Sequence, residues 1–470
     1  MRGRQSARVR ELVWDRMQGG AWPPGARLPA ERVLADELAV NRSTVAAVYD
    51  DLAADGVLER RRGSGTYVSD TLWGVAPNWR RYLAAGASRP SAALLSQIRR
   101  ARGSADLVDF TRADPGSDFW PTRELQQLWR DIDLGSVLAY APPEGWEPLR
   151  EAIAADMRRR TERVVSAASV LITAGASQAL YLVARGLLAP GDGVAMECPS
   201  YYYSLPLFQS AGLYLWPIAM DADGLLPESL EAILREHRPA MIWLNPTHHN
   251  PTGTALASER RLAVLALARR FHVPILEDDA FAGLDFSASP APAPLYGRDP
   301  AAGVIYVGTV SKSVAPGLRV GWMQAPDAVI RQLADVKGQM DLGTPLALQA
   351  LVAGWLAHPA RFAHQARVQA LLGERLDRFH EALAPLGALG ATGSRPSGGF
   401  YQWIRWPDGA SDQQWLAAAQ GARLVFMPGS VYGAPAGYAR FNFAAWPPPL
   451  VRKRLECLAR QAPVPAAARR

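Results

Sequence analysis

The segment Val304-Ile305-Tyr306-Val307-Gly308-Thr309-Val310-Ser311-Lys312 (residues 304–312) joins a short apolar run to a polar cluster that ends in a lysine. The apolar run predicts a buried strand, which is typical of a parallel sheet covered on both faces. Lysine occurs at only two other positions in the chain, Lys337 and Lys453. An amine just beyond a buried strand makes Lys312 a candidate for covalent chemistry.

Four other apolar runs precede residue 304 and repeat this pattern. Most are separated by helical stretches such as residues 261–271, which predicts a doubly wound, largely parallel sheet. The runs are Val170-Leu171-Ile172, Val194-Ala195-Met196, Met241-Ile242-Trp243-Leu244 and Pro274-Ile275-Leu276. Ligands of such sheets bind beyond the carboxyl ends of the strands. We therefore expect the segments that follow the five runs to share one crevice.

The segments that follow the runs offer complementary groups. Residues 173–178, Thr-Ala-Gly-Ala-Ser-Gln, open a helix with small residues, and the free amides of a helix N-terminus suit a phosphate. Tyr201 can place an aromatic face beside a planar ligand, while Asn250 is a donor and Asp278 a carboxylate. Together with the amine of Lys312, this set is what pyridoxal 5'-phosphate (PLP) requires.

PLP assigns a role to each group. Lys312 would form the Schiff base with the cofactor's aldehyde. Asp278 would keep the pyridine nitrogen protonated, and Asn250 would donate to the 3-oxygen of the ring. The residues expected to bind the phosphate are Ala176, Ser177, Thr309, Ser311 and Arg319.

The motifs Gly-Ala-Ser-Gln, Pro-Ser-Tyr, Asn-Pro-Thr-Gly, Glu-Asp-Asp and Ser-Lys resemble, in this order, those of fold-type I aminotransferases over about residues 106–460. The resemblance implies an α/β fold with a largely parallel doubly wound sheet and a smaller α+β subdomain. It also implies that Tyr201 stacks on PLP and that Arg440 grips the carboxylate of a substrate or effector. Tyr140 would reach the phosphate in the partner subunit of a homodimer. Arg440 alone would equally suit other anions or a structural ion pair.

The first 70 residues predict three short helices followed by a two-stranded wing. The second helix is expected near residues 30–38, and either Asn41 or Ser43 can cap the third. Two short helices joined by a tight turn form a helix-turn-helix, whose second helix enters the major groove of DNA. The residues expected to contact DNA are Arg32, Arg42, Ser43, Thr44, Arg62 and Gly63.

Three segments of this region resemble the winged helix-turn-helix of GntR-family regulators: Leu28–Arg32, Asn41–Val45 and Arg62–Val68. Joined to an aminotransferase-like part, this is the architecture of MocR-type bacterial transcription regulators. The resemblance implies a DNA-binding regulator whose second domain senses an amino compound, or PLP itself, through the Schiff-base lysine. It implies a double-stranded DNA operator as partner and a bacterial, cytoplasmic protein that is nucleoid-associated when bound to DNA.

We expect three parts: a winged helix-turn-helix domain (1–70), a basic linker (71–105) and an aminotransferase-like PLP-binding effector domain (106–470). The chain's formal net charge is +7. The first part carries +1, the linker carries +6 through six arginines without an acid, and the remainder is neutral. Such an asymmetry indicates an anionic partner, a membrane surface or nucleic acid, and the winged helix favours nucleic acid. The linker arginines either add phosphate contacts or belong to a simple tether.

Several classes of protein do not fit the sequence. No apolar run approaches the roughly 20 residues needed to span a bilayer, and the first residues lack the apolar core of a signal peptide. We therefore expect a cytoplasmic protein without a membrane partner. Two cysteines cannot form a disulfide framework. The adjacent His248 and His249 would face opposite ways on a strand, so no metal site is expected.

Two alternatives to a regulator remain. The chain can be an active PLP-dependent aminotransferase with an appended DNA-binding domain, or a structural dimeriser that binds no PLP. Phe281 stands where many aminotransferases have a tyrosine, three residues after the pyridine-binding aspartate. Phenylalanine cannot donate to the cofactor's oxygen, so transaminase turnover is expected to be residual.

Overall fold

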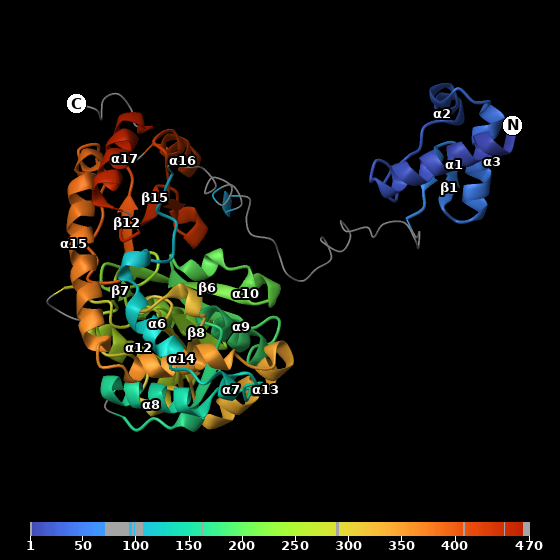
Figure 1. Ribbon diagram of the computed structural model, residues 1–470. Helices are drawn as coiled ribbons and strands as arrows, with labels where there is room; N and C mark the ends of the chain where they lie inside the picture. The colour runs from blue at the N-terminus through green and yellow to red at the C-terminus, as the bar shows by residue number, and fades with distance from the viewer. Residues whose placement is uncertain are drawn as a thin grey trace. The chain divides into compact units, whose positions relative to one another are not determined.

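The computed structural model describes residues 2–70, 94, 95, 98, 107–161, 163–287, 291–407, 409–445 and 447–463. The chain divides into two compact units, residues 1–87 and residues 88–470 (Figure 1). The predicted basic linker, residues 71–105, lies outside the described residues except for Leu94, Leu95 and Ile98.

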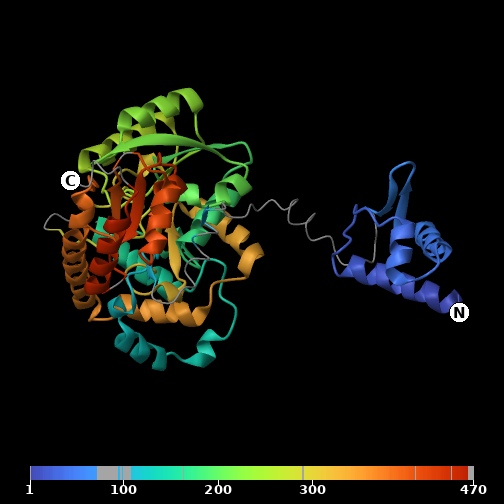
Figure 2. The same cartoon turned by 90° about the horizontal axis from the view of Figure 1, so that it is seen from above.

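Unit 1 is a helix-turn-helix with a wing, as predicted. Its elements are α1 (Arg2–Gln18), α2 (Glu31–Leu38), α3 (Arg42–Ala54), β1 (Leu58–Arg61) and β2 (Gly65–Val68). Asn41 caps α3, because its side-chain oxygen accepts from the backbone N–H of Ser43. Val13, Val48 and Leu52 form part of the apolar core between the helices. β1 and β2 pair antiparallel, and Figure 2 shows this hairpin projecting from the helices.

Unit 2 is built on an eight-stranded sheet. In spatial order the strands are β4 (Val170–Thr173), β11 (Gly321–Gln324), β10 (Val304–Thr309), β9 (Ile275–Asp278), β8 (Met241–Leu244), β5 (Gly193–Cys198), β6 (Tyr214–Asp221) and β7 (Gly224–Leu225). β11 runs antiparallel to both neighbours and β7 runs antiparallel to β6, whereas the other pairs are parallel. The fold is therefore the mixed, mainly parallel sheet that the five apolar runs predict.

Helices cover both faces of the sheet. They are α8 (Glu147–Thr161), α9 (Ala176–Gly186), α11 (Pro227–His237), α12 (Ser258–Phe271), α13 (Asp327–Asp341) and α14 (Leu346–Ala357). Side chains of a strand alternate between the faces. Leu171 accordingly packs in the cluster that contains α9 and α13, while Val170 and Ile172 pack in the cluster that contains α8 and α14. Three shorter helices are α6 (Thr122–Arg130), α7 (Leu134–Val137) and α10 (Leu207–Ser210).

A smaller subdomain follows the sheet. Its elements are α15 (Arg361–Gly387), β12 (Tyr401–Arg405), α16 (Asp412–Gly421), β13 (Leu424–Val425), β14 (Met427–Pro428), β15 (Tyr438–Asn442) and α17 (Pro448–Gln461). β12, β15 and β14 form a three-stranded sheet, and β13 pairs with β3 (Val108–Asp109). Figure 1 shows α15 running along the side of unit 2, from the helices that cover the large sheet to α17. Among the described residues, no helix is long and apolar enough to cross a membrane.

Arg261 of α12 joins the loop after β8 to β9. The side chain is fully buried. Its Nε donates to the Leu256 carbonyl at 2.9 Å and its Nη2 to the Pro246 carbonyl at 2.8 Å. Its Nη1 lies 3.8 Å from the buried carboxylate of Glu277. A single guanidinium therefore balances one buried charge and satisfies several loop carbonyls.

We expect Arg261→Met to lower the free energy of unfolding by about 3–5 kcal/mol, because it removes the buried positive charge beside Glu277 and the guanidinium donor of the Leu256 carbonyl. Urea unfolding followed by tryptophan fluorescence measures the change. Arg269→Ala is the matched control, since Arg269 lies on the same helix with 61% of its side chain exposed, and its effect should stay within about 0.5 kcal/mol. Equal stabilities of the two variants would contradict this account of Arg261.

Candidate functional sites

A cavity of about 500 Å³ lies at the carboxyl ends of β4, β5, β8, β9 and β10, where the sequence predicts a crevice. It is called the lysine crevice below. The predicted residues that line it are Ala176, Ser177, Tyr201, Asn250, Asp278, Thr309, Ser311, Lys312, Arg319 and Arg440. Tyr140 does not line the crevice, and 84% of its surface is exposed. The structure thus brings together ten of the eleven residues predicted for the cofactor and effector site.

One end of the crevice is suited to an anion. The helix α9 begins there at Ala176, directly after Gly175, whose φ of 97° favours glycine. Arg319 Nη2 donates to the Ala174 carbonyl at 2.8 Å, and a Cβ on Gly175 would lie 2.7 Å from that nitrogen. Thr309 Oγ1 donates to Ser311 Oγ at 3.0 Å. Free helix amides, hydroxyls and a guanidinium therefore gather around one end of the crevice, as phosphate binding requires.

Asp278, the last residue of β9, has one oxygen without a partner. Tyr201 donates its hydroxyl to Oδ2, whereas Oδ1 is buried and has no hydrogen-bond partner among the described residues. Burial raises the pKa of the carboxyl to about 6. A buried unpaired carboxylate oxygen needs a donor, and the protonated ring nitrogen of PLP is one. The residues present therefore fit this cofactor.

Lys312 and Arg440 approach the crevice from different elements. Lys312 Nζ donates to the Ala113 carbonyl at 2.6 Å and lies 6.0 Å from the ring centre of Phe281. Arg440, on β15, donates from Nη1 to Asn250 Oδ1 at 2.9 Å, and its Nε has no hydrogen-bond partner among the described residues. The Asn250 side-chain oxygen is therefore occupied, which leaves its amide nitrogen to face a ligand.

The sequence did not single out the residues that hold this site in place. Asn245 Nδ2 donates to the Asp278 carbonyl at 2.7 Å, and Asn245 Oδ1 accepts from the Asn250 backbone N–H at 2.7 Å. Glu197 Oε2 accepts from the backbone N–H of Asn245 at 2.7 Å and lies 3.5 Å from His249 Nε2. Asn245 thus connects the ends of β8 and β9. Its position directly after the apolar run 241–244 was the signal that could have identified it.

Burial keeps the supporting acid and base neutral. It raises the pKa of Glu197 to about 8 and lowers that of His249 to about 3. His248, the neighbouring residue, bonds instead to Asp285 at 3.1 Å. Within the described parts of the chain, no group of three or more His, Cys, Asp or Glu side chains is arranged to hold a metal ion.

Two residues from the predicted linker region also reach the crevice. Leu95 and Ile98 are among its lining residues, and Ile98 is buried against Val425, Met427 and Tyr432. The composition of residues 71–105 indicated a tether and gave no sign of this contact.

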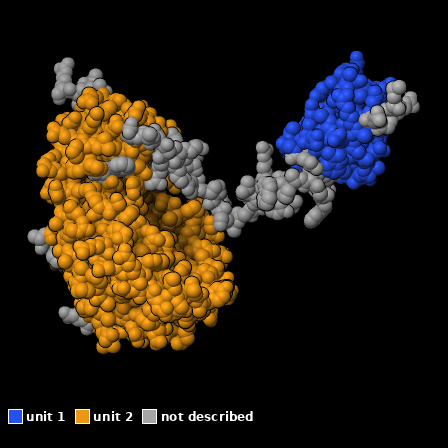
Figure 3. Space-filling model, in the orientation of Figure 1, with its two compact units in different colours: residues 1–87 blue, residues 88–470 orange. Residues whose placement is uncertain are grey.

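Most of the predicted DNA-contacting residues are exposed on unit 1, which is blue in Figure 3. Arg32, Ser43 and the two wing residues Arg62 and Gly63 are exposed. Of the remaining predicted residues, Arg42 has 71% of its side chain exposed, and Thr44 is buried. Ion pairs hold Arg42 and Arg60 against Glu31 at 3.3 Å and 3.2 Å. Glu31 therefore orients Arg42, at the start of α3, and Arg60, on strand β1 of the wing.

Comparisons with known protein families match both units. Residues 118–458 match the family described as aminotransferase class I and II, and residues 5–68 match the family described as bacterial regulatory proteins, gntR family. The HTH-type transcriptional regulator YdfD of Bacillus subtilis is 33% identical over 92% of this chain and 91% of its own. The HTH-type transcriptional regulator NorG of Staphylococcus aureus is 26% identical over 89% of this chain and 95% of its own.

Solved structures of aminotransferases superpose on unit 2. LysN, the alpha-aminoadipate aminotransferase of Thermus thermophilus complexed with N-(5'-phosphopyridoxyl)-L-leucine, superposes with a TM-score of 0.74 at 28% identity and covers 82% of this chain and 98% of its own. The kynurenine aminotransferase of Pyrococcus horikoshii superposes with a TM-score of 0.77 at 26% identity and covers 82% and 97%.

The raised pKa of Asp278 predicts that the free energy of unfolding of the cofactor-free protein falls as the pH rises. The folded state binds this proton more tightly than the unfolded chain, so the stability it contributes is complete below about pH 4 and is lost as the pH rises through about 6. Asparagine does not titrate, so Asp278→Asn does not lose this stability as the pH rises. Between pH 5 and pH 7.5 the variant should therefore gain about 1–2 kcal/mol of unfolding free energy relative to wild type.

Urea unfolding at the two pH values measures this difference. Asp131→Asn, at an exposed position, is the control and should show no such change with pH. A difference between Asp278→Asn and wild type that is the same at both pH values would show that the buried carboxyl has no raised pKa.

Proposed function

The chain belongs to the aminotransferase class I and II family and carries a GntR-family helix-turn-helix domain, and from this premise we propose that it is a PLP-dependent transcription regulator of the MocR type. The observation that carries the proposal is the convergence of Lys312, the half-satisfied Asp278 and the anion-binding end in one crevice. The same chain exposes Arg32, Arg42 and Arg62 on a winged helix-turn-helix.

In this proposal the lysine crevice holds the cofactor. Lys312 binds it covalently, Asp278 Oδ1 accepts from the ring nitrogen, Asn250 donates to the ring oxygen and Tyr201 lies against the ring. The residues proposed for the phosphate are Ala176, Ser177, Thr309, Ser311 and Arg319. When bound, PLP supplies an aldehyde carbon that reacts reversibly with amines.

The proposed effector is a small amine that also carries a carboxylate, or PLP itself. Arg440 supports the carboxylate, because its guanidinium lines the crevice and retains an unpartnered Nε within the described residues. Its stacking on Tyr401, at 4.0 Å from the ring centre, holds the guanidinium plane in place. An amine at Lys312 and a carboxylate at Arg440 would bridge the large sheet and the smaller subdomain.

A homodimer is the proposed assembly. Exposed apolar side chains gather in and around α7 and at the end of α13, and they include Trp129, Leu134, Leu138, Met340 and Leu342. A concentration of apolar residues of this kind is typical of a protein interface. The exposed Tyr140 adjoins them in sequence, and we propose that it reaches the phosphate in the partner subunit.

Unit 1 is proposed to bind double-stranded operator DNA in the bacterial cytoplasm. The start of α3 would enter the major groove with Arg42 and Ser43, and Arg62 and Gly63 would place the wing on the backbone. Arg32 would add a phosphate contact. Since Thr44 is buried, its proposed contribution is limited to its position at the start of the helix.

Leu95 and Ile98 suggest how an effector signal leaves the crevice. They line the cavity, lie near the start of unit 2 in the chain and belong to the predicted linker, residues 71–105. A ligand that binds two arrangements of this segment with different affinity shifts their populations. We propose that this displacement changes how the dimer engages DNA.

Lys312→Ala should abolish the cofactor's visible absorption band and the adduct trapped by borohydride, because no other amine lines the crevice among the described residues. Lys453→Ala, at an exposed position, is the control and should retain both signals. Mass spectrometry of the reduced peptides identifies the attachment site among three lysines. Covalent cofactor on Lys312→Ala would refute the assignment.

A single titration tests the regulator. We expect an amino acid to change the cofactor's spectrum and, over the same concentrations, to change the affinity for a DNA fragment selected by the protein from a random pool. Ile98→Ala should reduce the change in DNA affinity while keeping the spectral change, because Ile98 belongs to the predicted linker and also lines the crevice. Rapid transamination with a 2-oxo acid, without a specific DNA complex, would instead establish the aminotransferase alternative.

A further inference from the structure

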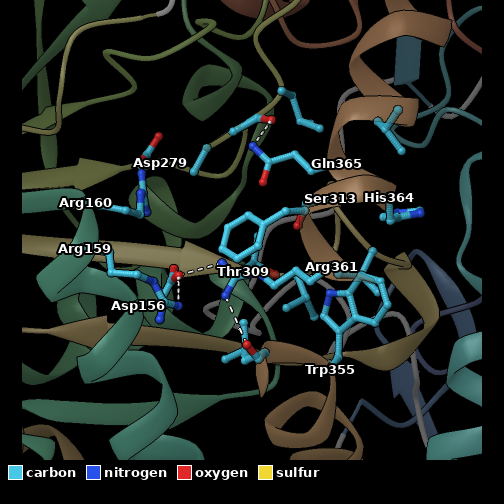
Figure 4. Close-up of a pocket in the computed structure, with 18 of the residues that line it drawn as sticks. Asp156, Arg159, Arg160, Asp279, Thr309, Ser313, Trp355, Arg361, His364 and Gln365 are labelled. Carbon is cyan, nitrogen blue, oxygen red and sulfur yellow. Dashed lines mark hydrogen bonds and ion pairs between the residues drawn. The ribbon is translucent and has the colours of Figure 1, made fainter. Parts of the chain in front are cut away.

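A second cavity, of about 470 Å³, lies between the large sheet and the start of α15 (Figure 4). It is called the hinge cavity below, because α15 connects the sheet with the smaller subdomain. α8 contributes Asp156, Arg159 and Arg160, which share one helix face by their spacing. α15 contributes Arg361, His364 and Gln365 with the same spacing, α14 contributes Trp355, and the segments after β9 and β10 contribute Asp279 and Ser313.

The charges of the hinge cavity do not balance. Asp156 Oδ1 accepts from Arg159 Nη2 at 3.0 Å and from Arg361 Nη2 at 2.6 Å. Asp279 Oδ2 accepts from Arg160 Nη2 at 2.6 Å. Three guanidinium groups thus face two carboxylates. The described lining therefore carries one excess positive charge, which favours an anionic ligand.

Three buried polar atoms of the lining have no hydrogen-bond partner within the described residues: Asp279 Oδ1, His364 Nε2 and Trp322 Nε1. Asp279 is 2% exposed and His364 is 8% exposed. Burial, with Arg367 nearby, lowers the pKa of His364, so the ring is neutral at pH 7. Arg367 Nη2 donates to His364 Nδ1 at 3.3 Å, which places the ring proton on Nε2. The lining therefore has one unused acceptor, Asp279 Oδ1, and two unused donors, His364 Nε2 and Trp322 Nε1.

The exposed fractions of the charged side chains indicate which end of a ligand would face solvent. Arg159 has 55% of its side chain exposed, Arg361 has 15% and Asp279 has 1%, so the cationic side opens to solvent and the acceptor lies deep. Val310, Val314 and Trp355 add an apolar wall. The cavity volume lies within the range of small-molecule sites.

We propose that the hinge cavity binds a second small molecule, a carboxylate that carries a hydrogen-bond donor on its neighbouring carbon and an apolar side chain. The carboxylate lies against Arg159 and Arg361 and accepts from His364 Nε2. The neighbouring amine or hydroxyl donates to Asp279 Oδ1. The apolar side chain packs against Trp355.

The hinge cavity adjoins the lysine crevice through shared backbone. Thr309 lines both cavities. Asp279 follows Asp278 in the chain and Ser313 follows Lys312, so two crevice residues each have a neighbour in the hinge cavity. A ligand that repositions α15 against these segments changes the surroundings of Lys312. Occupation of one cavity is therefore coupled to the other.

The binding test is independent of the proposed cofactor chemistry, because it uses full-length Lys312→Ala. The probes are L-phenylalanine, L-phenyllactate and 3-phenylpropionate, which lacks the neighbouring donor. Calorimetry should give dissociation constants below about 1 mM for the first two and at least about tenfold weaker binding for the third. Absence of saturation with every probe, or equal affinity for all three, would overturn the proposal.

Variants locate the site. Arg159→Gln and His364→Leu should each weaken L-phenyllactate at least about tenfold. Arg158→Gln, an exposed neighbour that does not line the cavity, and Arg440→Met in the lysine crevice should change it less than about twofold. Because Arg159 is largely exposed, its replacement tests the site even if His364→Leu fails to fold. Loss of binding in Arg440→Met with retention in Arg159→Gln would assign the probe to the lysine crevice and overturn the proposal.

The coupling has its own readout in the cofactor-loaded wild-type protein. L-phenyllactate has no amine to react with the cofactor, so a change in the visible absorption band that persists in Arg440→Met reports binding outside the lysine crevice. We expect this change in wild type and in Arg440→Met, and not in Arg159→Gln. An unchanged band at saturating L-phenyllactate would overturn the coupling.

Discussion

The carboxylate of Asp278 is the constraint on which the lysine crevice depends. β9 delivers it to a buried position where Tyr201 satisfies one oxygen and the other has no partner among the described residues. An unpaired buried carboxylate costs free energy, so the surrounding residues must hold it against relaxation. Asn245 does so through the Asp278 backbone, and Glu197 in turn fixes Asn245. The partner of Asp278 Oδ1 must therefore be a buried donor, which connects the stability of the empty fold to the occupation of its site.

Asp279, the next residue, is also a buried carboxylate, but it faces a different cavity and is paired with an arginine. Successive side chains at a strand end face opposite ways, so Asp278 faces the lysine crevice and Asp279 faces the hinge cavity. Asp279 Oδ2 is bonded by Arg160 and by the Tyr306 hydroxyl at 2.8 Å. This ion pair stabilises the position of β9 relative to α8. A single peptide unit joins the carboxylate of the lysine crevice to that of the hinge cavity.

The sequence predicted the parts of this arrangement that are encoded locally. Each of five buried strands is followed at once by polar residues, so their meeting at one edge followed from parallel topology. β6 and β11 were not predicted, because β6 contains Pro217 and is half-buried, and β11 has four residues with antiparallel neighbours. Arg160 and Asp279 are 119 positions apart, and no local pattern pairs them. The contact of Ile98 with the crevice was likewise hidden in a segment whose composition indicates a tether.

Phe281 connects the chemistry of the crevice to its proposed signalling role. Its ring packs edge-on against Phe400 and Tyr401, with centroids at 5.4 Å and 5.6 Å, and β12, which begins at Tyr401, pairs with the strand that carries Arg440. A tyrosine there would add a donor beside the cofactor, whereas phenylalanine keeps only the apolar contact with the smaller subdomain. A sensor shifts populations only while its ligand stays bound. In the proposed regulator the missing donor would slow the conversion of a bound amine, while Phe281 keeps the contact with the smaller subdomain.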